Sequence, residues 1–269
     1  MTRFLSRSQG FTLVELAMVL FIVSLLIGGL LMPLTAQNEI RGRQETDRAL
    51  ANIRDALIGF AAVNGRLPCP ADRTIASGVA NAGVEAVTVA GGPCACTDNA
   101  AGIAAIGAVA CDHDDNGAPS GVTGVVPWAT LGLSEADAWG NRYTYRVTTR
   151  FARLASLQTI FGGACAPTSN PAAAAFALCS VGDMSVKTAV GGTDIATAVP
   201  VIVVSHGRNT LGAYMTSGAQ VAGVVAGSDE AENANGDVNF VSNSVIDDQL
   251  IWLPTSILMG RMLSAGKLP

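Results

Sequence analysis

The sequence predicts an α+β protein in which one long N-terminal helix packs on an antiparallel β-sheet. Three observations lead to this prediction. An uncharged apolar run near the N-terminus continues into an amphipathic segment with helical spacing. Short segments of alternating apolar and polar residues, separated by turn residues, follow in the second half of the chain. Six cysteines lie after the apolar run, so we expect a loop-rich globular part that disulfides stabilise.

The composition excludes several classes of protein. With 269 residues the chain can bury a substantial core and suits one or two domains. It is 49% hydrophobic and only 14% charged, which is too apolar for a disordered or nucleic-acid-binding chain. The formal net charge of −5 implies no polycationic surface, so we expect no nucleic-acid partner. Two histidines leave little room for histidine-based catalysis.

The first predicted element is a membrane helix. No charged side chain occurs from Leu16 to Asn38, and a helix of this length spans roughly 35 Å, enough to cross the hydrocarbon core of a bilayer. Arg3 and Arg7 are the only charges in the first ten residues, and they hold the N-terminus on the cytoplasmic side. The rest of the chain is therefore expected outside the cytoplasm. Ordinary signal-peptide cleavage near Ala36 is the alternative.

The junction GFTLVE, from Gly10 to Glu15, resembles the recognition site of type IV prepilins and of the pseudopilins of type II secretion. The resemblance implies that an inner-membrane prepilin peptidase removes residues 1–10 as a leader and then methylates the new N-terminal residue, Phe11. The apolar segment, with residues 11–35 as its transmembrane part, is retained. A glycine suits the cleavage position because it has no Cβ to clash with the protease as the extended backbone approaches it.

Glu15 is an anomaly in this apolar setting, because a carboxylate in hydrocarbon costs a few kcal/mol. One interpretation is that it lies in the first helical turn, where the helix dipole favours a negative charge. The resemblance implies a second role, in which Glu15 pairs with the charged amino terminus of a neighbouring subunit as the helices bundle into a filament. Two such charges are less costly together than apart in an apolar medium.

The helix is predicted to continue beyond the membrane. Leu50, Ile53, Leu57 and Phe60 recur at three- and four-residue spacing, which indicates an amphipathic helix with one core-facing stripe. Asn64-Gly65 and the following Leu67-Pro68 end it. After the leader, residues 11–65 are therefore predicted to form one helix about 80 Å long. Half of it lies in the membrane and half packs on a globular domain.

Residues 66–269 form the predicted globular domain. We interpret 74–126 as a variable loop with short strands, and we expect strands at 143–149, 199–205, 239–242 and 249–253 and a terminal helix at 254–263. The string around Trp139-Gly140-Asn141 is similar to the one that opens the sheet of major pseudopilins. Together with the N-terminus, this resemblance implies a type IV pilin fold, with a long helix laid across an antiparallel sheet.

The cysteines are predicted to form three disulfides, because an even number in an oxidising compartment favours bridges. Cys165 with Cys179 is the pair we favour, since the loop between them is short. A zinc site that draws on Cys69, Cys94, Cys96, Cys111 and His113 is the alternative, but its spacing contains no CxxC pair. The six residues concerned are Cys69, Cys94, Cys96, Cys111, Cys165 and Cys179.

No cofactor is required, but two acidic segments are candidates for calcium. Asp112, Asp114 and Asn116 open a loop like that of an EF-hand, although Thr123 stands where the bidentate carboxylate would be. A second segment is similar in its position to the C-terminal calcium loop of major pseudopilins, and it carries Asp229, Glu230, Glu232 and Asp237. A solvated acidic turn is the alternative in both places.

These features favour a structural protein over an enzyme. Ser205 and His206 are adjacent, so in a strand their side chains point to opposite faces, and no phosphate-binding loop is present. The resemblance implies a single-pass bacterial inner-membrane protein with a periplasmic C-terminal domain, which later enters a filament. Its partners are other pilins or pseudopilins, the prepilin peptidase and the inner-membrane assembly platform.

The alternative function is a filament-tip binding module, either an adhesin or a minor pilin that captures a substrate. The shared N-terminus does not distinguish a type IV pilus from a type II secretion pseudopilus. Removing Arg3 and Arg7 with the leader leaves 14 basic against 21 acidic side chains, a formal charge of −7, which disfavours DNA capture at a tip.

Overall fold

The computed structural model describes residues 10–87, 94, 110–113, 119–152 and 174–268, apart from the side chains at 27–36, 110–113 and 119–120. The chain divides into two compact units, Met1–Gly42 and Arg43–Pro269. One helix, α1 (Leu13–Asn64), contributes residues to both units. It ends where Gly65 adopts a left-handed φ of 73°, and the Gly65 N–H donates to the Ala61 carbonyl at 2.8 Å. The sequence predicts this helix over 11–65.

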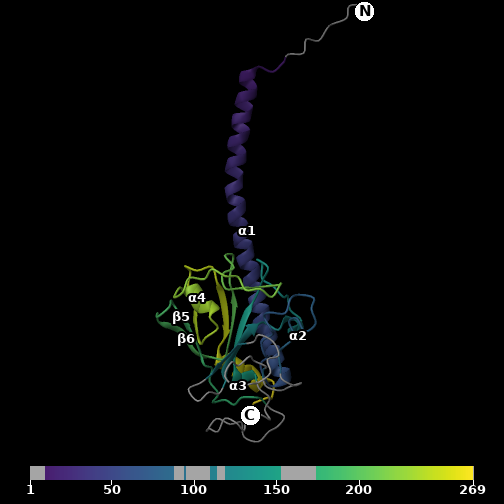
Figure 1. Cartoon of the computed structure of the whole chain (residues 1–269), viewed down its shortest axis with the longest axis vertical. Coiled ribbons are helices and arrows are strands. Elements are labelled where there is room, and N and C mark those ends of the chain that lie inside the picture. The colour runs from purple at the N-terminus through teal and green to yellow at the C-terminus, as the bar shows by residue number, and fades with distance from the viewer. Residues whose placement is uncertain (1–9, 88–93, 95–109, 114–118, 153–173, 269) are drawn as a thin grey trace, which may run out of the picture. The chain divides into compact units, whose positions relative to one another are not determined.

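The main sheet of the second unit has five antiparallel strands in the order β1-β2-β4-β7-β10. Figure 1 shows α1 running beside these strands within the second unit. The strands are β1 (Ala110–His113), β2 (Pro119–Val125), β4 (Thr144–Thr148), β7 (Val201–Ser205) and β10 (Gln249–Leu253). The predicted strands at 143–149, 199–205 and 249–253 correspond to β4, β7 and β10.

Among its described residues this unit also has two smaller sheets and four short helices. A three-stranded sheet has the order β6-β5-β9, in which β5 and β9 are parallel, and a two-stranded sheet pairs β3 with β8. The strands are β3 (Asn141–Arg142), β5 (Met184–Lys187), β6 (Asp194–Val199), β8 (Tyr214–Met215) and β9 (Asn239–Val241). The helices are α2 (Trp128–Leu131), α3 (Thr149–Ala152), α4 (Asp229–Ala234) and α5 (Thr255–Ser264).

The five-stranded sheet carries one hydrophobic cluster on each face. Val201 and Val203 of β7 belong to the cluster that includes the buried stripe of α1, while Ile202 and Val204 pack with the three-stranded sheet. The stripe consists of Leu50, Ile53, Leu57 and Ala61. Phe60, which the sequence places in this stripe, is only half-buried, and Ala61 takes its place.

This arrangement of a helix on antiparallel sheets with a disulfide is consistent with the expected pilin-like fold. One expectation is wrong: the acidic segment after Ser228 is not an open loop, because residues 229–234 form α4. The Ser228 side chain caps this helix by accepting from the Ala231 N–H. Three acidic residues in its first turn favour the helix electrostatically, so the charges that suggested a loop support a helix start.

Candidate functional site

The predicted cleavage position is open to a protease. Gly10 is exposed, and a Cβ placed on it would meet no atom within 4 Å. The next residue, Phe11, is 81% exposed. Among the described residues nothing in the fold requires glycine at position 10, and cleavage after it stays a prediction. The leader at 1–9 lies outside the described residues.

Glu15 forms a capping box with Thr12 at the start of α1. Its Oε2 accepts from the Thr12 backbone N–H at 3.0 Å and from the Thr12 hydroxyl at 2.9 Å. In return the Glu15 N–H donates to the Thr12 hydroxyl at 3.3 Å. This reciprocal pattern satisfies backbone donors that a helix N-terminus otherwise leaves without partners. Glu15 thus has the predicted first-turn role in the chain itself, and its pairing with a neighbouring subunit stays a prediction.

The first turns of α1 present an apolar surface. Large hydrophobic side chains from Phe11 to Leu26 are exposed all around the helix, and Glu15 is the one charged residue among them. A helix that is apolar on every side needs an apolar environment, either lipid or other helices. Measured over the described residues alone, no helix is long and apolar enough to cross a membrane. The side chains at 27–36 lie outside the described residues. The predicted span at 11–35 is therefore described with its side chains only as far as residue 26.

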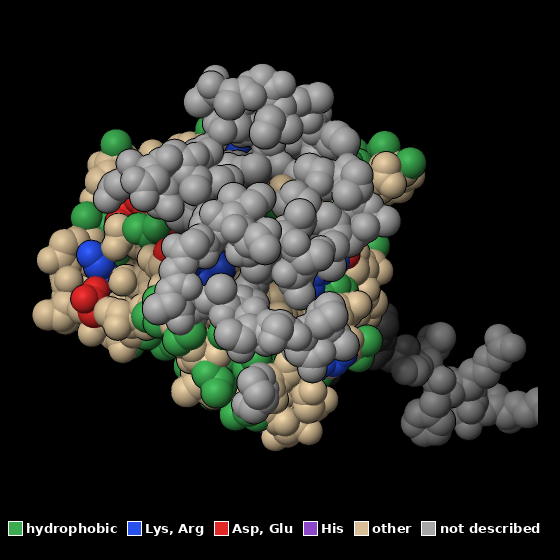
Figure 2. All heavy atoms as spheres, turned by 90° about the horizontal axis from the view of Figure 1, so that it is seen from below, with side chains coloured by type: hydrophobic (Ala, Val, Ile, Leu, Met, Phe, Trp, Pro, Cys, Tyr) green, Lys and Arg blue, Asp and Glu red, His purple; other side chains and the backbone are tan. Residues whose placement is uncertain are grey.

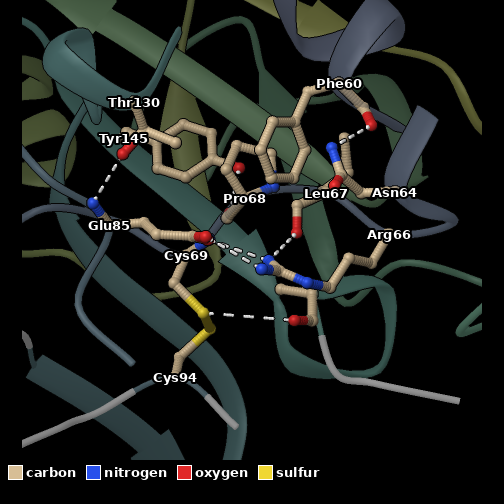
Figure 3. Close-up of polar contacts among 11 residues, drawn as sticks. Phe60, Asn64, Arg66, Leu67, Pro68, Cys69, Glu85, Cys94, Thr130 and Tyr145 are labelled. Carbon is tan, nitrogen blue, oxygen red and sulfur yellow. Dashed lines mark hydrogen bonds and ion pairs between the residues drawn. A yellow bond between two sulfur atoms is a disulfide. The ribbon is translucent and has the colours of Figure 1, made fainter. Parts of the chain in front are cut away.

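A polar latch, formed by Arg66, Glu85 and the Cys69–Cys94 disulfide, holds the chain where α1 ends (Figure 3). The Arg66 guanidinium makes a bidentate contact with the Glu85 carboxylate at 2.8 and 2.9 Å, and it lies 5.3 Å from the ring centre of Phe60. Glu85 also accepts from the Cys69 N–H at 3.2 Å. The ion pair and the disulfide therefore fix the same short stretch of chain.

One disulfide lies among the described residues, and it joins a pair that the sequence analysis did not single out. Cys69 is bonded to Cys94, so neither thiolate can ligate zinc, and the alternative zinc site is wrong for these two residues. Cys179 is also disulfide-bonded, but its predicted partner, Cys165, lies outside the described residues. Cys96 and the side chains of Cys111 and His113 lie outside them as well.

The turn that follows α2 is tied to the main sheet by a buried carboxylate. Asp137 accepts from the Trp139 and Asn141 N–H groups, each at 2.9 Å, and from the Ser205 hydroxyl at 2.7 Å. Burial raises the pKa of Asp137, and these hydrogen bonds lower it in part. Gly140 adopts a φ of 86°, which favours glycine at this point of the turn. The Trp139-Gly140-Asn141 string thus positions strands here.

Ser205 and His206 do not act on one another. Ser205 donates to Asp137, whereas His206 Nε2 lies 2.8 Å from the Thr144 hydroxyl. Both residues are fully buried, and burial lowers the pKa of His206 to about 4. The predicted opposite orientation of the two side chains agrees with these separate partners.

The two acidic segments lie in part among the described residues. Asp112 lies in β1, and Asp114 and Asn116 lie outside the described residues. In the second segment Asp229 accepts from the Val190 N–H at 2.8 Å and from Asn243 at 2.7 Å. The Asn209 amide donates to Glu230 at 2.5 Å.

The remaining acidic residues of this segment also make local contacts. Asp237 accepts from Asn235 and from the Asn239 N–H, while partial burial and the neighbouring Asp237 raise the pKa of Glu232. Across the part of the chain that the structure describes, no three His, Cys, Asp or Glu side chains gather to hold a metal ion. Calcium binding therefore stays a prediction.

Two buried arginines were missed by the sequence analysis. Arg142 and Arg146 are fully or almost fully buried. Arg142 pairs with Glu135 at 2.7 Å and stacks over Trp128, and Arg146 pairs with Asp183 at 3.3 Å. Both hold separate segments together. A signal was present in the sequence: Arg142 and Arg146 are four residues apart on either side of Tyr143 and Tyr145, so both arginines share one face of an extended stretch.

The comparison with known families gives one match. Residues 5–31 match the family described as the prokaryotic N-terminal methylation motif, which is the signature of type IV pilins and pseudopilins. The matched residues contain Gly10, Phe11 and Glu15. No curated protein and no solved structure matches the chain.

Proposed function

We propose that this chain is a structural subunit, of the minor pilin or pseudopilin kind, of a type IV pilus or a type II secretion pseudopilus. The precursor is anchored in the bacterial inner membrane by residues 11–35, with residues 66–269 in the periplasm. A prepilin peptidase cleaves it after Gly10 and methylates Phe11. The N-terminal methylation motif at residues 5–31 is the observation that carries this proposal.

The apolar start of α1 suits both states of such a subunit. In the membrane its exposed hydrophobic side chains contact lipid, and in a filament they contact the same helix of neighbouring subunits. Assembly therefore exchanges one apolar environment for another and needs no refolding of this segment. The chain has no phosphate-binding loop, so the proposal assigns the extraction to a separate cytoplasmic ATPase that acts through the assembly platform.

The disulfide supports a periplasmic place for the globular unit. Bridges persist in the oxidising periplasm and are rare in the cytosol. Both Cys69 and Cys94 are buried, so the bond between them belongs to the folded core of the unit. This agrees with an orientation in which Arg3 and Arg7 stay on the cytoplasmic side.

Glu15→Val tests the assembly role. We expect the variant to be cleaved normally but to enter filaments at least about tenfold less, because the carboxylate that pairs with a neighbour's amino terminus is gone. Thr12→Val is the control, since it breaks the capping box and keeps the carboxylate. Immunoblots of sheared filaments and of membranes measure both steps. Normal incorporation of Glu15→Val, or an equal loss in Thr12→Val, contradicts the pairing.

A filament-tip binding module, either an adhesin or a substrate-capturing minor pilin, is the second candidate. The long segment at 74–126 and the six cysteines favour a tip over a bulk subunit. Lys and Arg side chains are scattered singly on the described part of the face shown in Figure 2, which does not favour DNA as the ligand. Antibody labelling in negative-stain microscopy distinguishes the two: label along the fibres supports a bulk subunit, and label confined to their ends supports a tip.

Calcium binding by the acidic segment of α4 is part of the proposal and is tested separately. Glu230 and Asp237 offer hard oxygen ligands of the kind that calcium prefers. If the ion binds, millimolar calcium raises the melting temperature of the chain and EDTA reverses the change. An unchanged melting temperature would remove calcium from the account and leave the filament role intact.

A further inference from the structure

Two polar contacts hold α1 where it first meets the main sheet. The compact globular unit begins at Arg43. On the turn of α1 that begins there, the Gln249 side chain donates from Nε2 to the Arg43 carbonyl at 3.2 Å and to Asp47 Oδ1 at 2.6 Å. Gln249 is the first residue of β10. Its amide nitrogen faces the helix because both partners there are acceptors.

The second contact comes from the turn between α2 and β3. Thr46 is fully buried, although Glu45 and Asp47 beside it are exposed. The Thr46 hydroxyl accepts from the Ala138 N–H at 3.4 Å. The neighbouring Asp137 is bonded to Ser205 of β7, and Ser205 lies opposite Gln249 in the register of β7 and β10. Both contacts are therefore anchored at the same end of the adjacent strands β7 and β10.

We propose that these contacts form a clamp that keeps the assembly helix seated on the sheet when the helix is pulled. The clamp consists of Thr46 and Asp47 on α1 and of Ala138 and Gln249 on the sheet side. These are positioning residues, since their contacts hold α1 on the globular unit. The inference rests on the proposed function, because assembly is what applies a load to this helix.

The position of the clamp decides where α1 would begin to separate from the sheet. Below the clamp the contacts are apolar, through Leu50, Ile53 and Leu57, and such contacts have little directionality. The far end of the helix is fixed by the latch of Arg66, Glu85 and the disulfide. Force on the N-terminal part of α1 therefore acts first at residues 43–47, where separation must start. Directional hydrogen bonds at that position resist it before any apolar contact is lost.

Hydrogen exchange on the full-length chain in detergent tests the clamp. In Thr46→Val/Gln249→Leu we expect amide exchange in residues 44–51 to rise about tenfold, while residues 57–64 stay unchanged. Ile53→Val is the matched control, because it removes one buried methyl group from the same helix and keeps the clamp. In the control we expect a small rise spread evenly over 43–64. Unchanged exchange at 44–51 in the double variant, or a rise spread evenly over 43–64, overturns the proposal.

A charge exchange separates the clamp from a general packing effect. Gln249→Glu keeps the shape but sets a carboxylate against Asp47 and the Arg43 carbonyl, so exchange at 44–51 should rise more than in Gln249→Leu at pH 7.5. Adding Asp47→Lys restores an attractive contact and should bring the exchange at least halfway back on a logarithmic scale. Failure of this rescue contradicts a direct contact as the cause.

The role under load has its own measurement. The double variant Thr46→Val/Gln249→Leu should enter sheared filaments at least about fivefold less than Ile53→Val, with cleavage after Gly10 unchanged in both. Equal incorporation of the two variants would contradict a role of the clamp under load. The proposed function is tested separately, through cleavage after Gly10 and through Glu15. Hydrogen exchange at the clamp is measured without any filament, so the two can fail independently.

Discussion

The Arg66–Glu85 pair is the residue-scale contact on which the globular unit should depend most clearly. Their side chains are 7% and 16% exposed, and both are drawn in Figure 3. Removing one partner of a buried pair leaves the other charge without compensation. We expect Glu85→Gln to lower the free energy of unfolding by about 3 kcal/mol, measured by urea denaturation of the oxidised chain.

The chain provides a matched control for this prediction. Arg54 and Asp55 also form an ion pair, at 3.3 Å, but their side chains are 42% and 70% exposed. Water and salt screen such a pair, so Asp55→Asn should change the free energy of unfolding by less than about 0.5 kcal/mol. If both variants lose the same amount, burial does not explain the effect of Glu85.

His206 makes stability depend on pH. Burial lowers its pKa to about 4, and the pKa in the unfolded chain is about 6.5. The neutral ring is therefore favoured by folding. Its contribution is fully present above about pH 6.5 and is lost progressively as the pH falls toward 4, because the unfolded chain then binds a proton that the folded chain excludes.

This dependence is measured by difference. Between pH 7 and pH 4 the wild-type chain should lose about 3 kcal/mol more than His206→Gln, which cannot titrate in this range. Denaturant titrations at several pH values give both curves, and other groups that titrate contribute to both alike. Parallel curves would show that His206 is already accessible to protons in the folded chain.

At the scale of elements, the segment closed by Cys69–Cys94 depends on its disulfide. The bridge spans 25 residues, and a loop of that length is worth about 3 kcal/mol through the restricted unfolded chain. Cys69→Ala/Cys94→Ala should lose this amount. The loss should also appear as faster exchange at the end of α1, because Glu85 and Cys69 lie in the closed segment. A loss confined to the segment, with α1 unchanged, would contradict the coupling.

The elements that the sequence predicts well are those with an uninterrupted period or clear end signals. Leu50, Ile53 and Leu57 recur at helical spacing, and Asn64-Gly65 ends the helix as expected. The strand at 249–253 also has the predicted bounds, since acidic residues precede it and Pro254 follows. Local sequence is sufficient to predict these two elements because the spacing of apolar residues and the end signals indicate the same bounds.

The elements that were not predicted depend on contacts far away in the chain. β6 is mostly exposed and rich in alanine and threonine, so no burial pattern marks it, and it is a strand because β5 pairs with it. The segment of α4 was compared with an acidic calcium loop, and the Ser228 cap that begins the helix was not considered. At the N-terminus the motif predicted Gly10 and Glu15, but the hydrogen bonds between Thr12 and Glu15 became clear only from the helix geometry.

At the scale of the molecule, the account joins two parts with different tasks. The apolar start of α1 is proposed to contact lipid and then other subunits, while the globular unit is held together by buried arginines, a disulfide and two hydrophobic clusters. The motif at 5–31 supports the first task, and the sequence alone was enough to predict it. The second depends on long-range contacts, which is why its strand order could not be predicted.

The central claim is that α1 is retained after maturation without the leader. Intact-mass and N-terminal peptide mass spectrometry of the native chain tests it most directly. The account predicts a first residue of N-methylated Phe11 in the wild-type chain and an uncleaved N-terminus in Gly10→Leu, because a side chain at position 10 blocks the approach of the peptidase. A first residue after Ala36, or an unmodified Met1 in the wild-type chain, would contradict it.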